Sequence, residues 1–352
     1  MSTVTTVVRV PRLRSTTVNE RRKSDWPRVE LHVVSGKGGT GKTTVAAALA
    51  LALASRGKQV LLCEVEGRQG IAQLFDVPPL PYEERRIAQG LGDQGGDVYA
   101  LSIDAESAML EYIQLYYRMG NRTAKILDRF GVIDFATTIA PGLRDVLLTG
   151  KVFEAVERNS RNKGARVYDA VVLDAPPTGR ISQFLNVNGE FGDLAKVGMV
   201  KGQTERVMGL LKSRRTAVHL VTVLEDMPVQ ETADGITELR SHGLPVGGVV
   251  VNLTRPSDLD DEARAAALEG RLSREDTVAD LTKAGVDVTD ELVDGLLDEA
   301  TAYAERRALE DRQRERIAGL DVPSYTLERL PDGIDLGALY ELASDLREQG
   351  MA

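Results

Sequence analysis

The chain has 352 residues, of which 42% are hydrophobic and 28% are charged, and its net charge is −9. It is long enough to bury a substantial core, as two domains or as one enlarged α/β domain. No apolar run reaches about 18 residues and no signal-type apolar region follows the basic start, which excludes a membrane span and predicts a cytoplasmic protein.

Cysteine and histidine are too scarce for several kinds of site. Cys63 is the only cysteine, which excludes an intrachain disulfide and any Cys-x-x-Cys metal or cluster site within one chain. The three histidines, His32, His219 and His242, are far apart in the sequence. Each is expected to stand alone in the core or on the surface rather than to bind a metal.

Charge is spread unevenly along the chain. Residues 1–28 contain seven Arg or Lys and two acidic residues, Glu20 and Asp25, which gives them a net charge of +5. Since the whole chain has a net charge of −9, the remaining residues carry −14. The Ser/Thr/Arg-rich composition predicts a disordered basic leader over residues 1–28, with the globular domain at 29–348. An acidic body argues against a nucleic-acid-binding surface.

The first predicted elements are a buried strand at residues 29–34 and a helix at 44–55, joined by a Gly-rich turn. Gly36, Gly41, Lys42 and Thr43 satisfy G-x-x-x-x-G-K-[ST], the pattern of a phosphate-binding loop. Its backbone N–H groups and the start of the helix close around a polyphosphate, Lys42 supplies positive charge, and the Thr43 hydroxyl binds Mg²⁺. The predicted nucleotide ligands are Gly36, Lys37, Gly38, Gly39, Thr40, Gly41, Lys42, Thr43 and Thr44.

The remaining pattern alternates strands with helices, which predicts an α/β fold with a doubly wound, mostly parallel sheet. Strands are predicted at 59–65, 98–103 (as an edge strand), 167–173, 216–223, 246–251 and 324–327. Helices are predicted within 67–81, 104–160, 181–211, 228–243, 258–319 and 336–348. The helical stretches about 104–160 and 181–211 predict an inserted helical subdomain, a cap over one sheet edge; the alternative is that they form the outer layer of the sheet.

An aspartate stands at the end of the strand predicted over 167–173. Asp174 there has the Walker B arrangement, which holds Mg²⁺ directly or through water. It is followed by Ala-Pro-Pro-Thr-Gly-Arg, a turn in which Thr178 and Gly179 can bring a backbone N–H near a γ-phosphate. Losing that contact after hydrolysis would release the loop.

Two stretches carry a family resemblance. The second lysine, Lys37, makes the loop G-K-G-G-T-G-K-T, which resembles the deviant Walker A motif of nitrogenase iron proteins, MinD and ParA, and the arsenical-pump and tail-anchored-protein-targeting ATPases. The D-A-P-P-T-G-R stretch at 174–180 is similar to the switch II of the last two. The chain is identified as an actinobacterial-type member of this arsenical-pump-driving and tail-anchored-protein-targeting branch. Its single cysteine rules out the cysteine-rich arsenite site and the zinc site of that branch, and also the iron–sulfur site of the nitrogenase iron proteins.

The resemblance implies further site residues. Lys37 would reach the phosphates of the partner in a nucleotide-sandwich dimer, which makes it a candidate catalytic residue with Lys42. Glu66 falls on the aspartate that orients the attacking water, and Glu64 on the earlier acid, a candidate metal ligand; both are Glu where the family has Asp. Glu66 paired only with a cation is the alternative. Asn252, with Leu330 and Pro331, corresponds to the residues that contact adenine.

Three functions remain open from the sequence. The favoured hypothesis is a Mg-ATP-dependent ATPase, dimeric with itself or with a paralogous ATPase, that binds and releases a hydrophobic protein client through the cap. The second is a MinD/ParA-type positioning ATPase, against which the acidic final helix argues because membrane-targeting helices are basic; at most a peripheral membrane contact is expected. The third, suggested by Glu66, is a nucleotide-sensing, weakly active partner of a paralogue.

Overall fold

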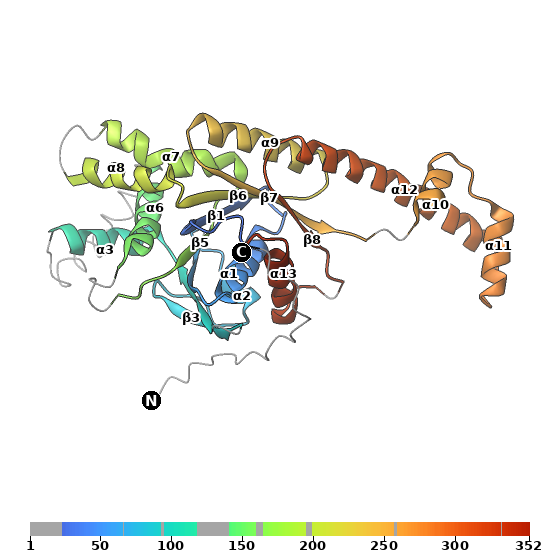
Figure 1. The fold of residues 1–352 in the computed structure, drawn as a ribbon, viewed down its shortest axis with the longest axis horizontal. Coiled ribbons are helices and arrows are strands. Elements are labelled where there is room, and N and C mark those ends of the chain that lie inside the picture. The colour runs from blue at the N-terminus through green and yellow to red at the C-terminus, as the bar shows by residue number, and fades with distance from the viewer. Residues whose placement is uncertain are drawn as a thin grey trace.

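An eight-stranded sheet organises the chain (Figure 1). The computed structural model describes residues 23–65, 67–92, 95–117, 141–159, 165–194, 199–256, 259–331 and 333–352. The strands are β1 (Leu31–Gly36), β2 (Gln59–Glu64), β3 (Arg85–Leu91), β4 (Gly96–Ser102), β5 (Ala170–Asp174), β6 (Thr216–Thr222), β7 (Val246–Thr254) and β8 (Ser324–Glu328). The helices are α1 (Lys42–Ala54), α2 (Gly70–Leu74), α3 (Ala105–Tyr117), α6 (Pro141–Glu157), α7 (Thr178–Leu194), α8 (Met199–Leu211), α9 (Asp226–Ser241), α10 (Asp261–Leu268), α11 (Arg274–Lys283), α12 (Asp290–Ala318) and α13 (Leu336–Glu348).

The strand order is β3-β4-β2-β5-β1-β6-β7-β8, and only the β3–β4 pair is antiparallel. One face of the sheet packs against α1, α2 and α13, and the other against α6 to α9. Alternating side chains explain this: Val34 of β1 lies in the first cluster and Val33 in the second. The predicted doubly wound, mostly parallel α/β fold is confirmed.

The predicted edge position of the strand near residues 98–103 is wrong. β4 pairs with β2 on one side and with β3 on the other, so β3 is the edge. β3 begins with Arg85 and Arg86, contains Gly90, and shows register shifts against β4. Charged and irregular sequence of this kind is typical of edge strands. Such a strand contains no long apolar run, so the apolar pattern of the sequence does not predict it.

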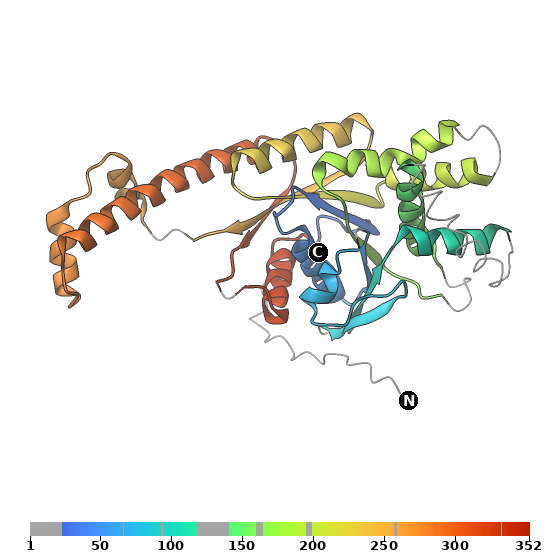
Figure 2. The same cartoon turned by 180° about the vertical axis from the view of Figure 1, so that it is seen from behind.

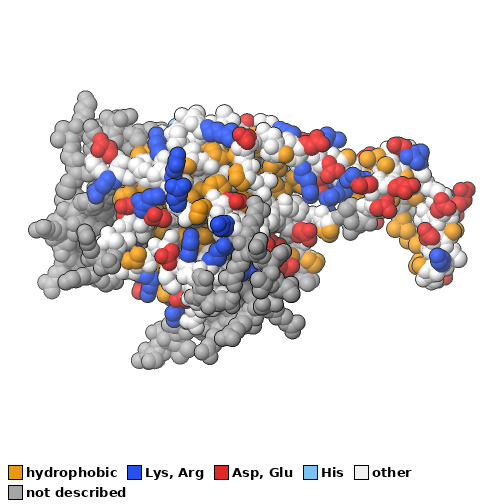
Figure 3. Space-filling model, in the orientation of Figure 1, with side chains coloured by type: hydrophobic (Ala, Val, Ile, Leu, Met, Phe, Trp, Pro, Cys, Tyr) orange, Lys and Arg blue, Asp and Glu red, His pale blue; other side chains and the backbone are white. Residues whose placement is uncertain are grey.

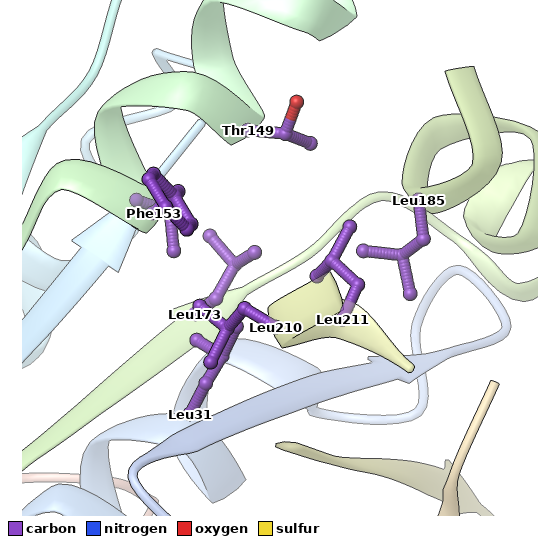
Figure 4. A pocket seen from close by; sticks show the side chains of 8 residues that line it. Leu31, Thr149, Phe153, Leu173, Leu185, Leu210 and Leu211 are labelled. Atoms are coloured by element: carbon purple, nitrogen blue, oxygen red, sulfur yellow. The ribbon is translucent and has the colours of Figure 1, made fainter. Parts of the chain in front are cut away.

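Four helices fall within the two stretches predicted as a cap. α3, α6, α7 and α8 gather on one side of the molecule (Figure 1, Figure 2). An apolar cavity of about 10 Å³ lies where α6, α7 and α8 meet β1 and β5 (Figure 4). A space this small is at the limit for one water molecule, so these helices are closely packed on the sheet. Residues 118–140, 160–164 and 195–198 of the predicted cap lie outside the described residues, and its separate role stays a prediction.

Three helices form an arm that projects from the body. We use "arm" for α10, α11 and α12, residues 261–318 (Figure 2). The C-terminal part of α12 lies beside α9, where Ile317 is buried in the core, whereas α11 has no buried residue. Acidic side chains gather along the outer part of the arm (Figure 3). Across the ranges described above, no helix is both long and apolar enough to cross a membrane.

Two histidines contact each other at the centre of the sheet, which corrects the expectation that each stands alone. His32 of β1 and His219 of β6 are fully buried, and their Nδ1 and Nε2 atoms are 3.1 Å apart. The Gly248 N–H donates to His219 Nδ1, so Nε2 carries the proton of a neutral His219 and donates it to His32. No local pattern marks this pair, because its members are 187 residues apart.

Residues 23–28 of the predicted leader are among the described residues. The Trp26 ring contacts His219 edge-on, with 5.3 Å between ring centroids, and its Nε1 donates to the Tyr325 hydroxyl at 2.9 Å. Tyr325 in turn donates to Asp25 at 2.8 Å. The only tryptophan of the chain therefore reports on the packing around the buried histidines.

The histidine pair predicts a loss of stability in mild acid. Burial lowers the pKa of His219 to about 3, and burial is also the main cause that lowers the pKa of His32 well below 6.5. Both stay neutral when folded, whereas the unfolded chain takes up protons below its histidine pKa of about 6.5. The free energy of unfolding should fall by about 1.4 kcal/mol per buried histidine between about pH 7.5 and pH 5.5.

Urea unfolding followed by Trp26 fluorescence measures this loss. His242→Gln is the control, because His242 lies at the C-terminal end of α9 and is only half-buried, and it should leave the fall unchanged. A free energy of unfolding that stays constant over this interval would contradict the assignment.

Candidate functional site

The predicted phosphate loop connects β1 to α1 at the carboxyl edge of the central strands. Gly36 ends β1, residues 37–41 form the turn, and Lys42 begins α1. β1 lies between β5 and β6, so the loop is flanked by the segments that follow both strands. In open α/β sheets this edge, next to the point where strand order reverses, is where ligands bind.

Two glycines are required by close contacts. A Cβ on Gly36 would lie 2.2 Å from the Val221 carbonyl oxygen of β6, and one on Gly41 would lie 2.4 Å from Asn252 Nδ2. Gly41 also has φ of 86°, in the left-handed region. The loop therefore lies against β6 and against the Asn252 side chain of β7, and glycine at these two positions makes room for both contacts.

The start of α1 offers positive charge without a competing side chain. No side chain caps it, and its first turn contains no acidic residue, so its N–H groups and dipole face the loop. Lys42 is 9% exposed, and Thr44 is half-buried beside it. Thr40 is buried, and its hydroxyl donates to the Lys37 carbonyl at 2.9 Å, which closes the turn. Gly38 and Gly39 form its exposed tip.

Thr43 and Asp174 meet across the loop. The Thr43 hydroxyl donates to Asp174 Oδ2 at 2.7 Å, although the two residues are 131 positions apart. Asp174 ends β5 and is 9% exposed. A hydroxyl and a carboxylate in contact, beside a phosphate loop, fit Mg²⁺, which takes one or two protein oxygens and completes its shell with phosphate and water.

Glu64 makes different contacts from those expected of a metal ligand. It ends β2 in register with Asp174, but its carboxylate accepts from the N–H groups of Gln69 at 2.6 Å and Ile71 at 3.2 Å, and so caps α2. Across the described ranges, no three His, Cys, Asp or Glu side chains lie close enough to hold a metal. Glu66 lies outside the described residues, and its role stays a prediction.

Lys37 forms an ion pair that the sequence did not indicate. Its Nζ is 2.8 Å from Glu231 Oε1 of α9, and both side chains are about one third exposed. Glu231 follows Lys37 by almost two hundred positions in an ordinary charged helix, so no local pattern marks it.

The segment after Asp174 is tied to the same site. The Ser35 hydroxyl donates to the Pro176 carbonyl at 2.6 Å, which links the end of β1 to the Pro-Pro turn. Thr178, predicted in a turn, is the first residue of α7 and is buried, with Gly179 as the second. The predicted switch thus begins at the N-terminus of a helix.

Asn252 contacts the loop directly. It is 4% exposed, and its Nδ2 donates to the Thr40 carbonyl at 2.9 Å. The next residue, Leu253, has φ of 58° and is 44% exposed, where the β7–β8 register shifts. Leu330, half-buried, and Pro331, exposed, follow β8 at the same edge. The adenine contacts assigned to these residues stay predictions.

Comparison with known proteins finds ATPases among the relatives of this chain. Residues 29–213 match the model of the family described as anion-transporting ATPase. The chain is 52% identical over 330 residues to ATPase BagA of Mycobacterium tuberculosis, covering 93% of this chain and 96% of the relative. It is 23% identical over 272 residues to ATPase GET3 of Lachancea thermotolerans (68% and 76% covered), and 24% identical over 266 residues to a protein of Aquifex aeolicus provisionally named arsenical pump-driving ATPase 2 (66% and 83% covered).

The Asn252 contact predicts an effect without nucleotide. Asn252→Ala removes a buried donor from the Thr40 carbonyl and should lower the free energy of unfolding by about 1–2 kcal/mol in nucleotide-free protein. Asn252→Asp, of nearly the same volume, should destabilise at least as much at neutral pH, because its carboxylate faces a carbonyl oxygen. Urea unfolding measures both; unchanged stability would mean that Asn252 acts only on a bound base.

Proposed function

The chain belongs to the anion-transporting ATPase family, and from this premise we propose that it is a Mg-ATP-dependent switch that binds and releases a protein client. The observation that carries the proposal is the Thr43–Asp174 contact beside the glycine-rich loop. The loop N–H groups and Lys42 would hold the phosphates, and Thr43 and Asp174 would hold Mg²⁺. Bound Mg²⁺ would neutralise charge that develops on the phosphates.

The segment after Asp174 supports a switch. Its Pro176 carbonyl is bonded to Ser35 at the start of the loop, and Thr178 lies against Gly235 of α9. A γ-phosphate bound in the loop would attract the N-terminal N–H groups of α7, and its loss would release them. α7 is itself one of the helices predicted as a cap, so its movement would carry the switch to that part of the chain.

We propose that the active form is a nucleotide-sandwich dimer without a thiol or metal clasp. Cys63 is fully buried in β2, and burial raises the pKa of its thiol to about 12, so it neither binds a metal nor bridges chains. Lys37 is partly exposed at the loop, as a residue that reaches another subunit must be. Association would then depend on bound nucleotide.

We assign the client to the predicted cap. A surface cleft of about 240 Å³ lies between α6 and α8 and is lined by Phe153, Glu157, Arg206, Gly209, Leu210, Ser213 and Arg215. Two arginines and a glutamate among its lining residues make this cleft mixed in character. It suits a polar or amphipathic peptide better than a purely apolar one.

A specific residue favours a second candidate function. Glu66 replaces aspartate at the position assigned to the attacking water, and its longer side chain must approach from a different backbone position. The chain would then be a weakly active, nucleotide-sensing partner of a paralogous ATPase.

Removal of the Lys42 charge tests the favoured proposal. Lys42→Ala should lower ATP turnover by at least about a hundredfold, because a preorganised charge on the phosphates is lost. Lys212→Ala, an exposed lysine just after α8, is the control and should keep wild-type turnover. Steady-state phosphate release measures both, with circular dichroism as the folding check. Wild-type hydrolysis by Lys42→Ala would exclude the assignment.

Glu66 separates the two candidate functions. If the chain hydrolyses ATP by itself, Glu66→Ala should reduce turnover of the purified chain by about a hundredfold, the effect of losing general-base help. In a chain that only senses nucleotide, the low turnover would not respond to the change, while nucleotide binding measured by calorimetry would be retained.

A further inference from the structure

The helix α9 contacts both the candidate site and the arm. We infer that Glu231 is a positioning residue that holds Lys37 until nucleotide binds, and that α9 transmits the release of Lys37 to the base of the arm. This inference rests on the proposed function, because it requires an anionic nucleotide at the loop.

On the site side, α9 makes two contacts one turn apart. Glu231 pairs with Lys37 at 2.8 Å. Gly235 packs so closely against the Thr178 side chain that a Cβ built on Gly235 would lie 2.5 Å from Thr178 Cγ2. Residues four apart share one face of a helix. This face of α9 therefore touches the phosphate loop and the segment after Asp174 together.

On the arm side, a second pair of residues four apart faces α12. Asp226 accepts from Gln313 Nε2 at 2.6 Å, and Gln230 accepts from Arg316 Nη2 at 2.6 Å. Gln313 is 2% exposed, whereas the Asp226 side chain is 71% exposed, so the contact is buried only on the α12 side. Figures 1 and 2 both show α9 and the C-terminal part of α12 side by side.

Contacts with the phosphate loop and with α12 are both made from the first six residues of α9, Asp226 to Glu231. Gln230 and Glu231 are neighbours in sequence, so a displacement of the Glu231 backbone moves the Gln230 contact with α12 as well. The opposite side of α9 is fixed by Val229, Ile236 and Leu239 in the core, which favours rotation or a small slide of the whole helix over local unfolding.

The Lys37–Glu231 pair is suited to exchange. Both side chains are partly exposed, and an ion pair of this kind is weak. A triphosphate carries more negative charge than one carboxylate and sits where the loop N–H groups also point. We therefore expect bound nucleotide to break the Lys37–Glu231 ion pair and to pair with Lys37, whether the nucleotide is bound to this chain or to a partner copy.

The test uses hydrogen exchange of the full-length protein with and without Mg²⁺ and a non-hydrolysable ATP analogue. In the wild type, the analogue should protect residues 36–44 and change exchange in α9 and in residues 310–318. Glu231→Gln should show the changed exchange at 310–318 without the analogue and should bind it about two- to fivefold more tightly, the gain from removing a weak competing pair. Glu231→Asp should restore most of the wild-type behaviour.

Glu238→Gln is the matched control, the same chemical change at an exposed position two turns further along α9, and it should behave like the wild type. Analogue protection at 36–44 with no change at 310–318 would overturn the inference and leave the proposed function standing. Identical behaviour of Glu231→Gln and Glu238→Gln would overturn the positioning role. No protection at 36–44 would overturn the proposed function itself.

Discussion

The site depends on how closely the loop backbone approaches the neighbouring strands. Gly36 lies against the Val221 carbonyl of β6, and Gly41 lies against the Asn252 amide of β7, at distances that exclude any Cβ. These contacts hold the turn in place without a ligand, so phosphate binding does not carry the entropic cost of ordering the loop. Because β1 lies between β5 and β6, the same contacts bring the loop next to Asp174, and the Thr43–Asp174 bond follows from the strand order.

The parallel sheet brings residues that are far apart in the sequence together at its carboxyl edge. Ser35, Asp174 and Asn252 stand at or near the carboxyl ends of β1, β5 and β7, and each bonds to the loop or to the segment after Asp174. Side chains at this edge serve two purposes. Asn252 holds the loop, and Glu64 caps α2 with both carboxylate oxygens, while its role as a metal ligand stays a prediction.

Local patterns were sufficient to predict the phosphate loop, the succession of most buried strands along the chain and the mostly parallel fold, because each depends on residues close together in the chain. They were insufficient for β3, whose arginines and glycine resemble a loop, and for contacts between distant segments. The His32–His219 and Lys37–Glu231 pairs join residues from different elements, and neither residue type nor spacing indicates its partner. The helix at residue 178 was missed for another reason: Pro176 and Pro177 suggest a turn, but proline is also favoured just before or at the start of a helix.

The strength of the Lys37–Glu231 pair decides what it can do. A pair whose partners are about one third exposed contributes at most about 1 kcal/mol, and salt weakens it further. A buried pair would hold Lys37 too firmly, since breaking it leaves an uncompensated charge at a cost of about 3–5 kcal/mol. At the observed exposure Lys37 has a defined position without nucleotide, yet its transfer to phosphate costs little. Since α9 bonds to α12 through Asp226 and Gln230, the proposed release of Lys37 would act on the arm through these two contacts.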